Sequence, residues 1–226
     1  ITSFGDNSIM LAWLDDQGAG ANRIEYSSGP TPNSLGSDLE IHAPVTDQGS
    51  PDITSLSNGG ANGGAVSVFT EGTDLKGQLF DTSKNPIGSE ITLNSGWSLG
   101  GAGSGMLQVR VASLTSGGFA VIWQASNGTD QDVYARTFDS AGGALVDING
   151  NTADEAGDQS APEIVGLDDG GFIAVWVDGV TNAIKGKVFS DAGIAVSDEL
   201  TISDSASAAS APHVDAFPNG DFVVTW

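Results

Sequence analysis

The sequence predicts an all-β fold, and more specifically a β-propeller built from four-stranded blades of about fifty residues each. Three observations lead to this prediction. A short apolar phrase that ends in a large aromatic residue recurs along the chain, apolar residues are spaced by two, and glycine is frequent, with 32 of the 226 residues. Spacing by two and abundant glycine both disfavour helices. An open array of stacked β-repeats is the alternative architecture.

The recurring apolar phrase gives the chain its repeat length. Its copies end at Trp13, Phe69, Trp123, Trp176 and Trp226, with a spacing that drifts only between 56 and 50 residues. Chance does not produce such regularity, so each copy is expected to mark one structural repeat. Within the phrase, as in 119–123, the run is almost continuously apolar. In a short segment bounded by turns, such a run indicates a strand that is buried on both faces.

Each apolar phrase is expected to form a hairpin with the segment before it. That segment ends in a large apolar residue, and a turn rich in Gly, Asn or Asp follows, which are residues that tolerate positive φ. The large apolar residues are Phe4, Leu56, Leu114, Leu167 and Phe217. The sequence therefore predicts that the first and second strands of every repeat pair in the antiparallel sense.

Two more strands complete the predicted repeat. The third strand is predicted over 75–80, 133–138 and 184–189, with a degenerate first copy at 23–26. The fourth strand alternates apolar and polar residues, as in 146–148, which is typical of a half-buried strand. One repeat alone is too small to hold a core. We therefore expect the second strand of each repeat to bury its aromatic residue against the next copy along the chain.

The repeats suggest one domain that spans residues 1–226. The predicted blades cover approximately 1–49, 50–106, 107–160 and 161–210, with a partial fifth blade at 211–226. Four complete units and one hairpin do not close a ring, and the sequence begins and ends within strand-like segments. We therefore expect the chain to be a fragment of a larger protein.

Composition excludes several classes of function. The chain has 29 acidic and 7 basic residues and a formal net charge of -22. Such a charge repels a phosphate backbone or an anionic membrane surface, so neither nucleic-acid binding nor membrane insertion is expected, and no apolar run is long enough to span a bilayer. There is no cysteine and there are only two histidines. Disulfides, thiolate metal sites and multi-histidine zinc centres are therefore excluded.

Acidic residues recur in the loop after the second strand of every complete repeat. Carboxylate oxygens are ligands that calcium prefers, so these loops are candidate calcium sites. Solvated turn residues are the alternative interpretation, because Asp favours turns. The candidate ligands are Asp15, Asp16, Glu71, Asp74, Asp130, Asp132 and Asp178, and a second, weaker cluster contains Asp154, Glu155 and Asp158.

One aromatic residue and two histidines are further candidates for a site. Trp97 breaks the repeat pattern, and in an exposed loop it could stack on a sugar ring; packing beneath the loop is the alternative. His42 and His213 occupy variable polar positions of the repeat, so we assign no catalytic residue. His213 stands where the other repeats have Asp52, Arg110 and Glu163.

Two segments carry a resemblance to a known group of proteins. Gln159–Trp176 and Asp132–Gly142 resemble the repeats of very large secreted bacterial surface proteins of the RTX, or hemolysin-type calcium-binding, group. The resemblance covers nearly the whole chain and is strongest from Gly117 onward. It implies export, a calcium-rich medium and a role in adhesion or extracellular assembly. The glycine-aspartate nonapeptide of that group is absent, since 100–105 contains no Asp, so the motif itself does not imply calcium binding.

Three functions follow from these observations. The first is a non-enzymatic structural or adhesive module of a secreted bacterial protein, with cell-surface glycans or other surface proteins as partners. The second is a carbohydrate-binding, lectin-like propeller, and the third is a glycan-active hydrolase, which would need two paired carboxylates. No pair stands out from the repeating background, so the sequence favours the first function.

Overall fold

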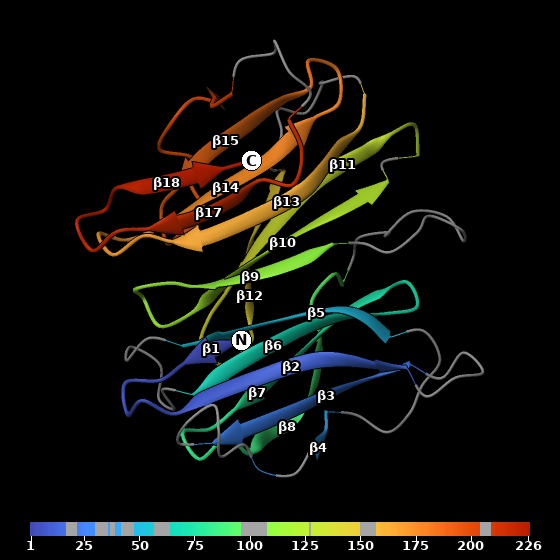
Figure 1. The fold of residues 1–226 in the computed structure, drawn as a ribbon, viewed down its shortest axis with the longest axis vertical. Coiled ribbons are helices and arrows are strands. Elements are labelled where there is room, and N and C mark those ends of the chain that lie inside the picture. Colours follow the sequence, from blue (N-terminus) through green and yellow to red (C-terminus); the bar gives the residue numbers. More distant parts are fainter. Residues whose placement is uncertain are drawn as a thin grey trace.

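The computed structural model describes residues 1–16, 22–29, 36, 39–41, 48–56, 64–95, 108–126, 128–149, 157–203 and 209–226. All regular elements in these residues are β-strands, which confirms the predicted all-β class. Within the same residues, no helix has the length and apolarity needed to cross a membrane. The strands form successive antiparallel sheets, and each sheet is built from strands that are consecutive in the sequence (Figure 1).

Among the described residues, four sheets have four strands each, and a fifth sheet has two. The first sheet contains β1 (Thr2–Ser3), β2 (Ile9–Asp16), β3 (Asn22–Gly29) and β4 (Leu39–Glu40). The second contains β5 (Gln48–Ser55), β6 (Ala65–Glu71), β7 (Asp74–Phe80) and β8 (Pro86–Thr92). The third contains β9 (Val109–Ser113), β10 (Phe119–Ser126), β11 (Gln131–Phe138) and β12 (Ala144–Asn149). The fourth contains β13 (Gln159–Gly166), β14 (Phe172–Asp178), β15 (Ala183–Phe189) and β16 (Leu200–Thr201), and the last contains β17 (His213–Ala216) and β18 (Phe222–Thr225).

The sheets follow the order of the predicted strands, with small differences at the ends. β5 begins at Gln48 and β13 at Gln159, slightly before the predicted starts of those blades at 50 and 161. The third strand of the first sheet, expected to be degenerate at 23–26, is a full strand of 8 residues. It forms because β3 pairs with β2 along its whole length, so the ladder compensates for the irregular sequence.

The predicted turn between the first and second strands has one recurring geometry. In the third sheet the amide of Leu114 donates to the carbonyl of Gly118 at 2.9 Å, and the amide of Gly117 donates to the carbonyl of Leu114 at 2.9 Å. Gly117 has a φ of 88°, a left-handed conformation that glycine adopts without strain. The same two hydrogen bonds recur in the fourth and fifth hairpins, in the segments 167–171 and 217–221.

The second strands are buried on both faces by alternate residues. Phe119, Val121 and Trp123 of β10 pack into a core shared with the second sheet. Ala120 and Ile122 of the same strand pack into a core shared with the fourth sheet. Trp123 and its equivalent in β14 are 0% exposed. The predicted burial is therefore confirmed for these strands.

The predicted direction of aromatic packing was wrong. Trp123 packs with the second sheet and Trp176 with the third, so each contacts the preceding repeat and not the next one. Phe69 follows the same rule, because it shares a core with Met10 and Ile24 of the first sheet. The period of two determines which side chains share a face. The order of the sheets in space determines whether the face that carries the aromatic residue packs against the preceding or the following sheet.

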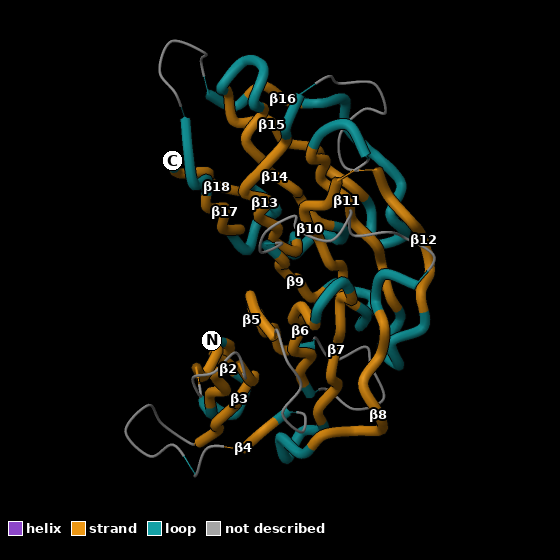
Figure 2. Tube along the Cα trace, turned by 90° about the vertical axis from the view of Figure 1, so that its right-hand side faces the viewer, coloured by secondary structure: helices purple, strands orange, loops and turns teal. Residues whose placement is uncertain are grey.

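The sheets are arranged along an open arc. Figure 2 shows β17, β13, β9 and β5 along the inner side of the arc, and β12 and β8 along its outer side. Consecutive inner strands contact one another, from β5 to β9, β9 to β13 and β13 to β17. The first strand of each repeat thus lines the concave side.

The turns between the third and fourth strands contact the preceding sheet. Asp191, in the turn after β15, accepts hydrogen bonds from the hydroxyl of Thr115 at 2.8 Å and the amide of Ser116 at 2.8 Å, both in the third sheet's first turn. Gly142, in the equivalent turn of the third sheet, lies so close to β8 that an added Cβ would be 2.0 Å from Ile91. Gly142 also has a φ of 84°, a left-handed conformation that glycine adopts without strain, so glycine suits this turn.

Candidate functional site

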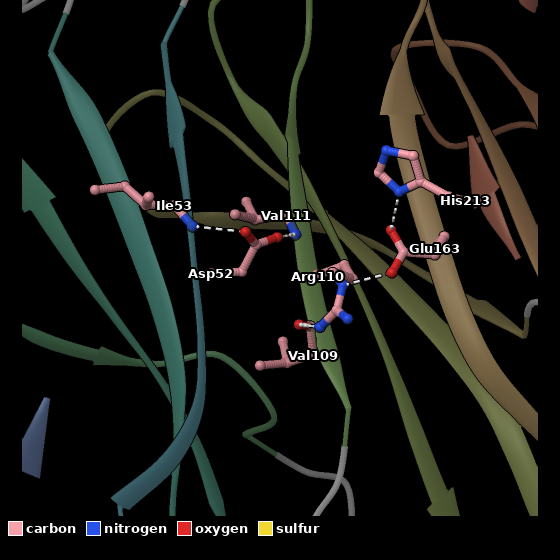
Figure 3. A network of polar contacts seen from close by, with 7 residues as sticks. All are labelled: Asp52, Ile53, Val109, Arg110, Val111, Glu163 and His213. Atoms are coloured by element: carbon pink, nitrogen blue, oxygen red, sulfur yellow. Dashed lines mark hydrogen bonds and ion pairs between the residues drawn. The ribbon is translucent and has the colours of Figure 1, made fainter. Parts of the chain in front are cut away.

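Four polar side chains occupy one equivalent position on four successive inner strands. They are Asp52 on β5, Arg110 on β9, Glu163 on β13 and His213 on β17, and we call them the inner-strand row. Figure 3 shows that they lie in sequence across the inner strands, with their side chains directed toward neighbouring sheets. The row is the polar network on which the candidate site is built.

Asp52 joins the second sheet to the third. Its carboxylate accepts a hydrogen bond from the amide of Val111 on β9 at 2.9 Å and another from the amide of Ile53 at 2.9 Å (Figure 3). Burial raises the pKa of the Asp52 carboxyl and outweighs these two amide donors and the positive charge of Arg110, all of which lower it. The second and third sheets are therefore joined here by hydrogen bonds to a largely buried carboxyl group.

Glu163 links three sheets at once. The Nε of Arg110 donates to Glu163 Oε1 at 2.7 Å, and His213 Nδ1 lies 3.7 Å from Glu163 Oε2. The Arg110 guanidinium also donates to the carbonyl of Val109 at 2.9 Å. The side chain of Glu163 is 15% exposed and that of His213 is 73% exposed. A largely covered carboxylate thus lies between two basic side chains, and the sign of charge alternates along the row when His213 is protonated.

A backbone irregularity recurs immediately before the row. Three residues other than glycine have positive φ near 50° and each directly precedes a proline, namely Ser50, Ala161 and Ala211. The pairing register shifts at this point, between Gly49 and Asp52 in β5 and between Ser160 and Glu163 in β13. A β-bulge therefore redirects the inner strand where the row begins.

The acidic loops of the first two sheets lie beside basic side chains. Asp15 is 3.5 Å from the Nε of Arg23. Glu71 and Asp74 lie 3.8 Å and 3.3 Å from the ammonium group of Lys76. The side chain of Asp16 lies outside the described residues. In these two sheets the described candidate ligands Asp15, Glu71 and Asp74 thus form ion pairs with a basic residue of the third strand.

The third loop has two carboxylates with polar neighbours. Asp130 accepts a hydrogen bond from the amide of Gly157 at 2.9 Å. Asp132 is buried and accepts one from the Tyr134 hydroxyl at 3.3 Å. Burial, together with the negative charges of Asp132 and Asp130, raises the pKa of Tyr134 to about 12. Asp158 of the weaker cluster reaches the same loop, because its carboxylate accepts the amide hydrogen of Gln131 at 2.9 Å.

The fourth loop holds Asp178 by local hydrogen bonds. The residue is buried, and burial opposes its ionisation, but the Thr181 hydroxyl and the Val180 amide donate to it and together lower its pKa. Among the residues that the structure describes, no three acidic or histidine side chains gather as a metal-binding group. Asp154, Glu155, Trp97 and His42 lie outside those residues. Calcium binding and sugar stacking remain predictions.

Replacing Asp52 with asparagine is expected to remove a pH-dependent part of the stability. The folded-state pKa of Asp52 is raised above 3.8, so its contribution is fully present below pH 3.8 and is lost as the pH rises through the raised pKa. The native protein should therefore lose free energy of unfolding relative to Asp52→Asn when the pH is raised from about 3.5 to about 6.5. Urea unfolding of both proteins at the two pH values measures this difference. A difference that is independent of pH would contradict the burial of this carboxyl.

Comparison with known proteins shows similarity in fold. No family model matches the chain, and no curated protein matches it. A puromycin hydrolase variant complexed with PGG is similar with a TM-score of 0.52 and 15% identity, over 99% of this chain and 34% of that one. Prolyl oligopeptidase B from Galerina marginata is similar with a TM-score of 0.51 and 7% identity, over 99% of this chain and 29% of that one. A polysaccharide lyase of family PL25, an ulvan lyase, is similar with a TM-score of 0.53 and 12% identity, over 95% of this chain and 57% of that one.

These similarities extend over nearly the whole of this chain. The chain itself spans about a third of the length of the puromycin hydrolase and of the prolyl oligopeptidase, and just over half of the length of the lyase. At such low identity the similarity concerns the fold alone. The chain therefore has an all-β fold of successive antiparallel sheets, of a kind also found within known hydrolases and lyases.

Proposed function

We propose that the chain is part of a β-propeller in a secreted bacterial protein and serves there as a non-enzymatic structural or adhesive module. The observation that carries this proposal is that the inner-strand row links neighbouring sheets. Asp52 bonds to β9, and Glu163 is held between Arg110 and His213, so these charged groups join one sheet to the next. Side chains at equivalent positions of four successive repeats thus contribute to assembly of the scaffold.

The propeller part of the proposal is supported by the arrangement of the sheets. Successive four-stranded sheets follow an arc, the first strand of each lies on the inner side, and neighbouring sheets share apolar cores (Figure 2). This is the way blades pack around a propeller axis. The last hairpin keeps the same inner position, with Val214 and Val224 packed against the fourth sheet. Further blades of this kind would continue the arc.

The extracellular part of the proposal is supported by composition and by the resemblance of the repeats. A net charge of -22 and the absence of cysteine suit a soluble surface module. The resemblance to RTX-group repeats favours export and adhesion, with cell-surface glycans or surface proteins as partners. Calcium bound at the acidic loops would add to the stability of such a module by mass action.

A glycan-binding or glycan-active function is the second candidate. It is favoured by the similarity in fold to the ulvan lyase and by the group formed by Arg110, Glu163 and His213. A carboxylate and an imidazole in contact are able to act as acid and base. The exposed His213 side chain makes this group accessible from the concave side of the described part of the arc.

Assays on the native chain distinguish the two candidates. The protein is incubated with neutral and uronate-containing polysaccharides, and released reducing ends and unsaturated products are measured beside a glycan-binding array. The structural function predicts no product, and it predicts that Glu163→Gln lowers the melting temperature because the link between sheets is weakened. Product formation that Glu163→Gln abolishes without changing the melting temperature would instead establish the enzymatic function.

A further inference from the structure

The fourth strand of the third sheet lies at the edge of its sheet. Among the described strands β12 pairs with β11 alone, and it runs along the outer side of the arc (Figure 2). The amide of Asp139 donates to the carbonyl of Gly143 at 2.9 Å. Because hydrogen bonding alternates along an antiparallel ladder, the backbone groups of Ala144, opposite Phe138, point away from β11. We call this side of the strand the outer edge of β12.

The other outer strands have features that hinder pairing with a further strand. β4 and β16 are only two residues long. β8 begins with Pro86, contains Gly88 with a φ of 67° beside a shift in register, and carries Glu90. β12 has 6 residues, most of them apolar, and contains no proline, glycine or lysine. A longer apolar edge of this kind is able to accept another strand.

Exposed apolar side chains flank the outer edge of β12. Leu145 and Val146 are 57% and 37% exposed, and Ile194 and Val196, in the segment after β15, are 66% and 63% exposed. The two segments lie side by side, because a Cβ added at Gly193 would be 3.2 Å from the Cβ of Val146. The four exposed residues therefore form one surface across the third and fourth sheets, which we call the outer apolar patch.

The two faces of β12 differ in character. Val146 and Ile148 share the face toward the fourth sheet, where a Cβ added at Gly193 would approach both. Successive side chains of a strand point to opposite faces, so Asp147 lies on the other face, where it pairs with Arg136. The side chain of Asp147 is still 50% exposed. A strand added at this edge would therefore meet apolar side chains on one face and a carboxylate on the other.

We propose that the outer edge of β12 is a strand-acceptor site, and that its occupant is an extended segment of another protein in which apolar and basic residues alternate. Backbone hydrogen bonds to β12 supply affinity, and alternate side chains supply specificity. The apolar residues cover the outer apolar patch, and the basic residues approach Asp147. The proposal rests on the adhesive function proposed above for the kind of partner, and it adds the surface and the sequence pattern that this partner needs.

Charge favours this occupant over a second copy of the chain. The chain has a formal net charge of -22. Asp139 and Asp147 on the β11–β12 hairpin and Asp198 after the outer apolar patch are all exposed. Two copies that met through β12 would bring these carboxylates together, and like charges opposed in a sheet are destabilising. A basic segment instead complements them.

The test uses the native chain and a fluorescently labelled peptide of alternating lysine and valine, capped at both ends. Fluorescence anisotropy is expected to show binding of this peptide. At saturation the amide of Ala144 should exchange hydrogen at least about tenfold more slowly than in the chain without peptide. The same peptide with glutamate in place of lysine should not bind, because its charge has the same sign as that of the chain.

Two substitutions separate strand addition from general attraction of a cationic peptide. Leu145→Lys puts a positive charge into the outer apolar patch, and it should weaken binding at least about tenfold. Val180→Lys is the matched control, because it makes the same change of charge at a side chain that is 61% exposed and lies outside the patch. It should leave the affinity within about twofold, since screening by salt limits the reach of one surface charge.

Three results would overturn the proposal. The first is that the peptide does not bind, or that it binds and leaves exchange at Ala144 unchanged. The second is equal weakening by Leu145→Lys and Val180→Lys. The third is protection of Ala144 that grows with concentration of the chain alone, because this would assign the edge to a second copy. None of these results involves Glu163, so they are distinguishable from failure of the proposed function, which product formation abolished by Glu163→Gln would show.

Discussion

Replacing Trp176 with alanine is expected to lower the free energy of unfolding by about 3 to 5 kcal/mol. The side chain is 0% exposed and lies in the core between the third and fourth sheets, with Ile122 and Leu114 from the preceding repeat. Removing it leaves a cavity that neither sheet can close without moving against the other. Denaturant unfolding monitored by circular dichroism measures the loss.

Trp226→Ala is the matched control for this substitution. The two tryptophans stand at the same position of the repeat, but Trp226 is 59% exposed. Its replacement is expected to cost less than about 1 kcal/mol, since most of the side chain is already in water. Equal losses at the two positions would mean that contact between repeats does not determine the stability.

Replacing Arg136 with methionine is expected to cost about 2 to 4 kcal/mol. The side chain is 5% exposed, pairs with Asp147 and donates to the carbonyls of Leu93 at 2.7 Å and Ser95 at 3.2 Å. These carbonyls belong to the preceding sheet, at the end of β8. Methionine retains an apolar stem of similar length but leaves the carbonyls without their donor. The measurement is again the free energy of unfolding.

Lys187→Met provides the comparison for Arg136→Met. Lys187 pairs with Ala174 on β14 as Arg136 pairs with Val121 on β10, so the two basic residues are equivalent. Lys187 is only half-buried, and its loss is expected to change stability by less than about 0.5 kcal/mol. If Arg136→Met costs no more than Lys187→Met, the guanidinium does not hold the two sheets together.

The strands could be predicted because their signal is local. The continuous apolar run 119–123 and turn residues such as Gly170 are present in the sequence itself, and the structure has a strand and a turn there. Burial of Trp123 followed from the same pattern. The neighbour that Trp123 contacts did not follow, because an apolar run says nothing about which sheet lies on which side of the strand.

The bulge before the inner-strand row could not be predicted from the usual conformation of a residue that precedes proline. A residue that precedes proline is biased toward extended conformations, yet Ala161 precedes Pro162 and has a φ of 51°. The pairing of β13 with β14 on either side of the bulge holds this conformation. The positive φ of Ala161 is therefore imposed by strand pairing and cannot be predicted from the Ala161-Pro162 sequence alone.

The inner-strand row has a signal in the sequence. Asp52, Arg110, Glu163 and His213 share one position of the repeat and are alternately acidic and basic, which an interpretation of each position as merely variable and polar does not use. Equivalent positions of adjacent repeats lie side by side, so such alternation indicates contact. Arg136 pairs with Asp147 on the adjacent strand, and its further bonds to Leu93 and Ser95 reach a different sheet, which the local sequence around Arg136 does not indicate.

The central claim, that adjacent repeats stabilise each other through shared cores, is tested most directly by a double-mutant cycle between Ile122→Ala and Trp176→Phe. The two residues come from different sheets and one core, so a coupling free energy of about 0.5 to 3 kcal/mol is predicted. Leu75→Ala lies in the previous core and should add to Trp176→Phe within about 0.5 kcal/mol. Full additivity of Ile122→Ala and Trp176→Phe would contradict the claim.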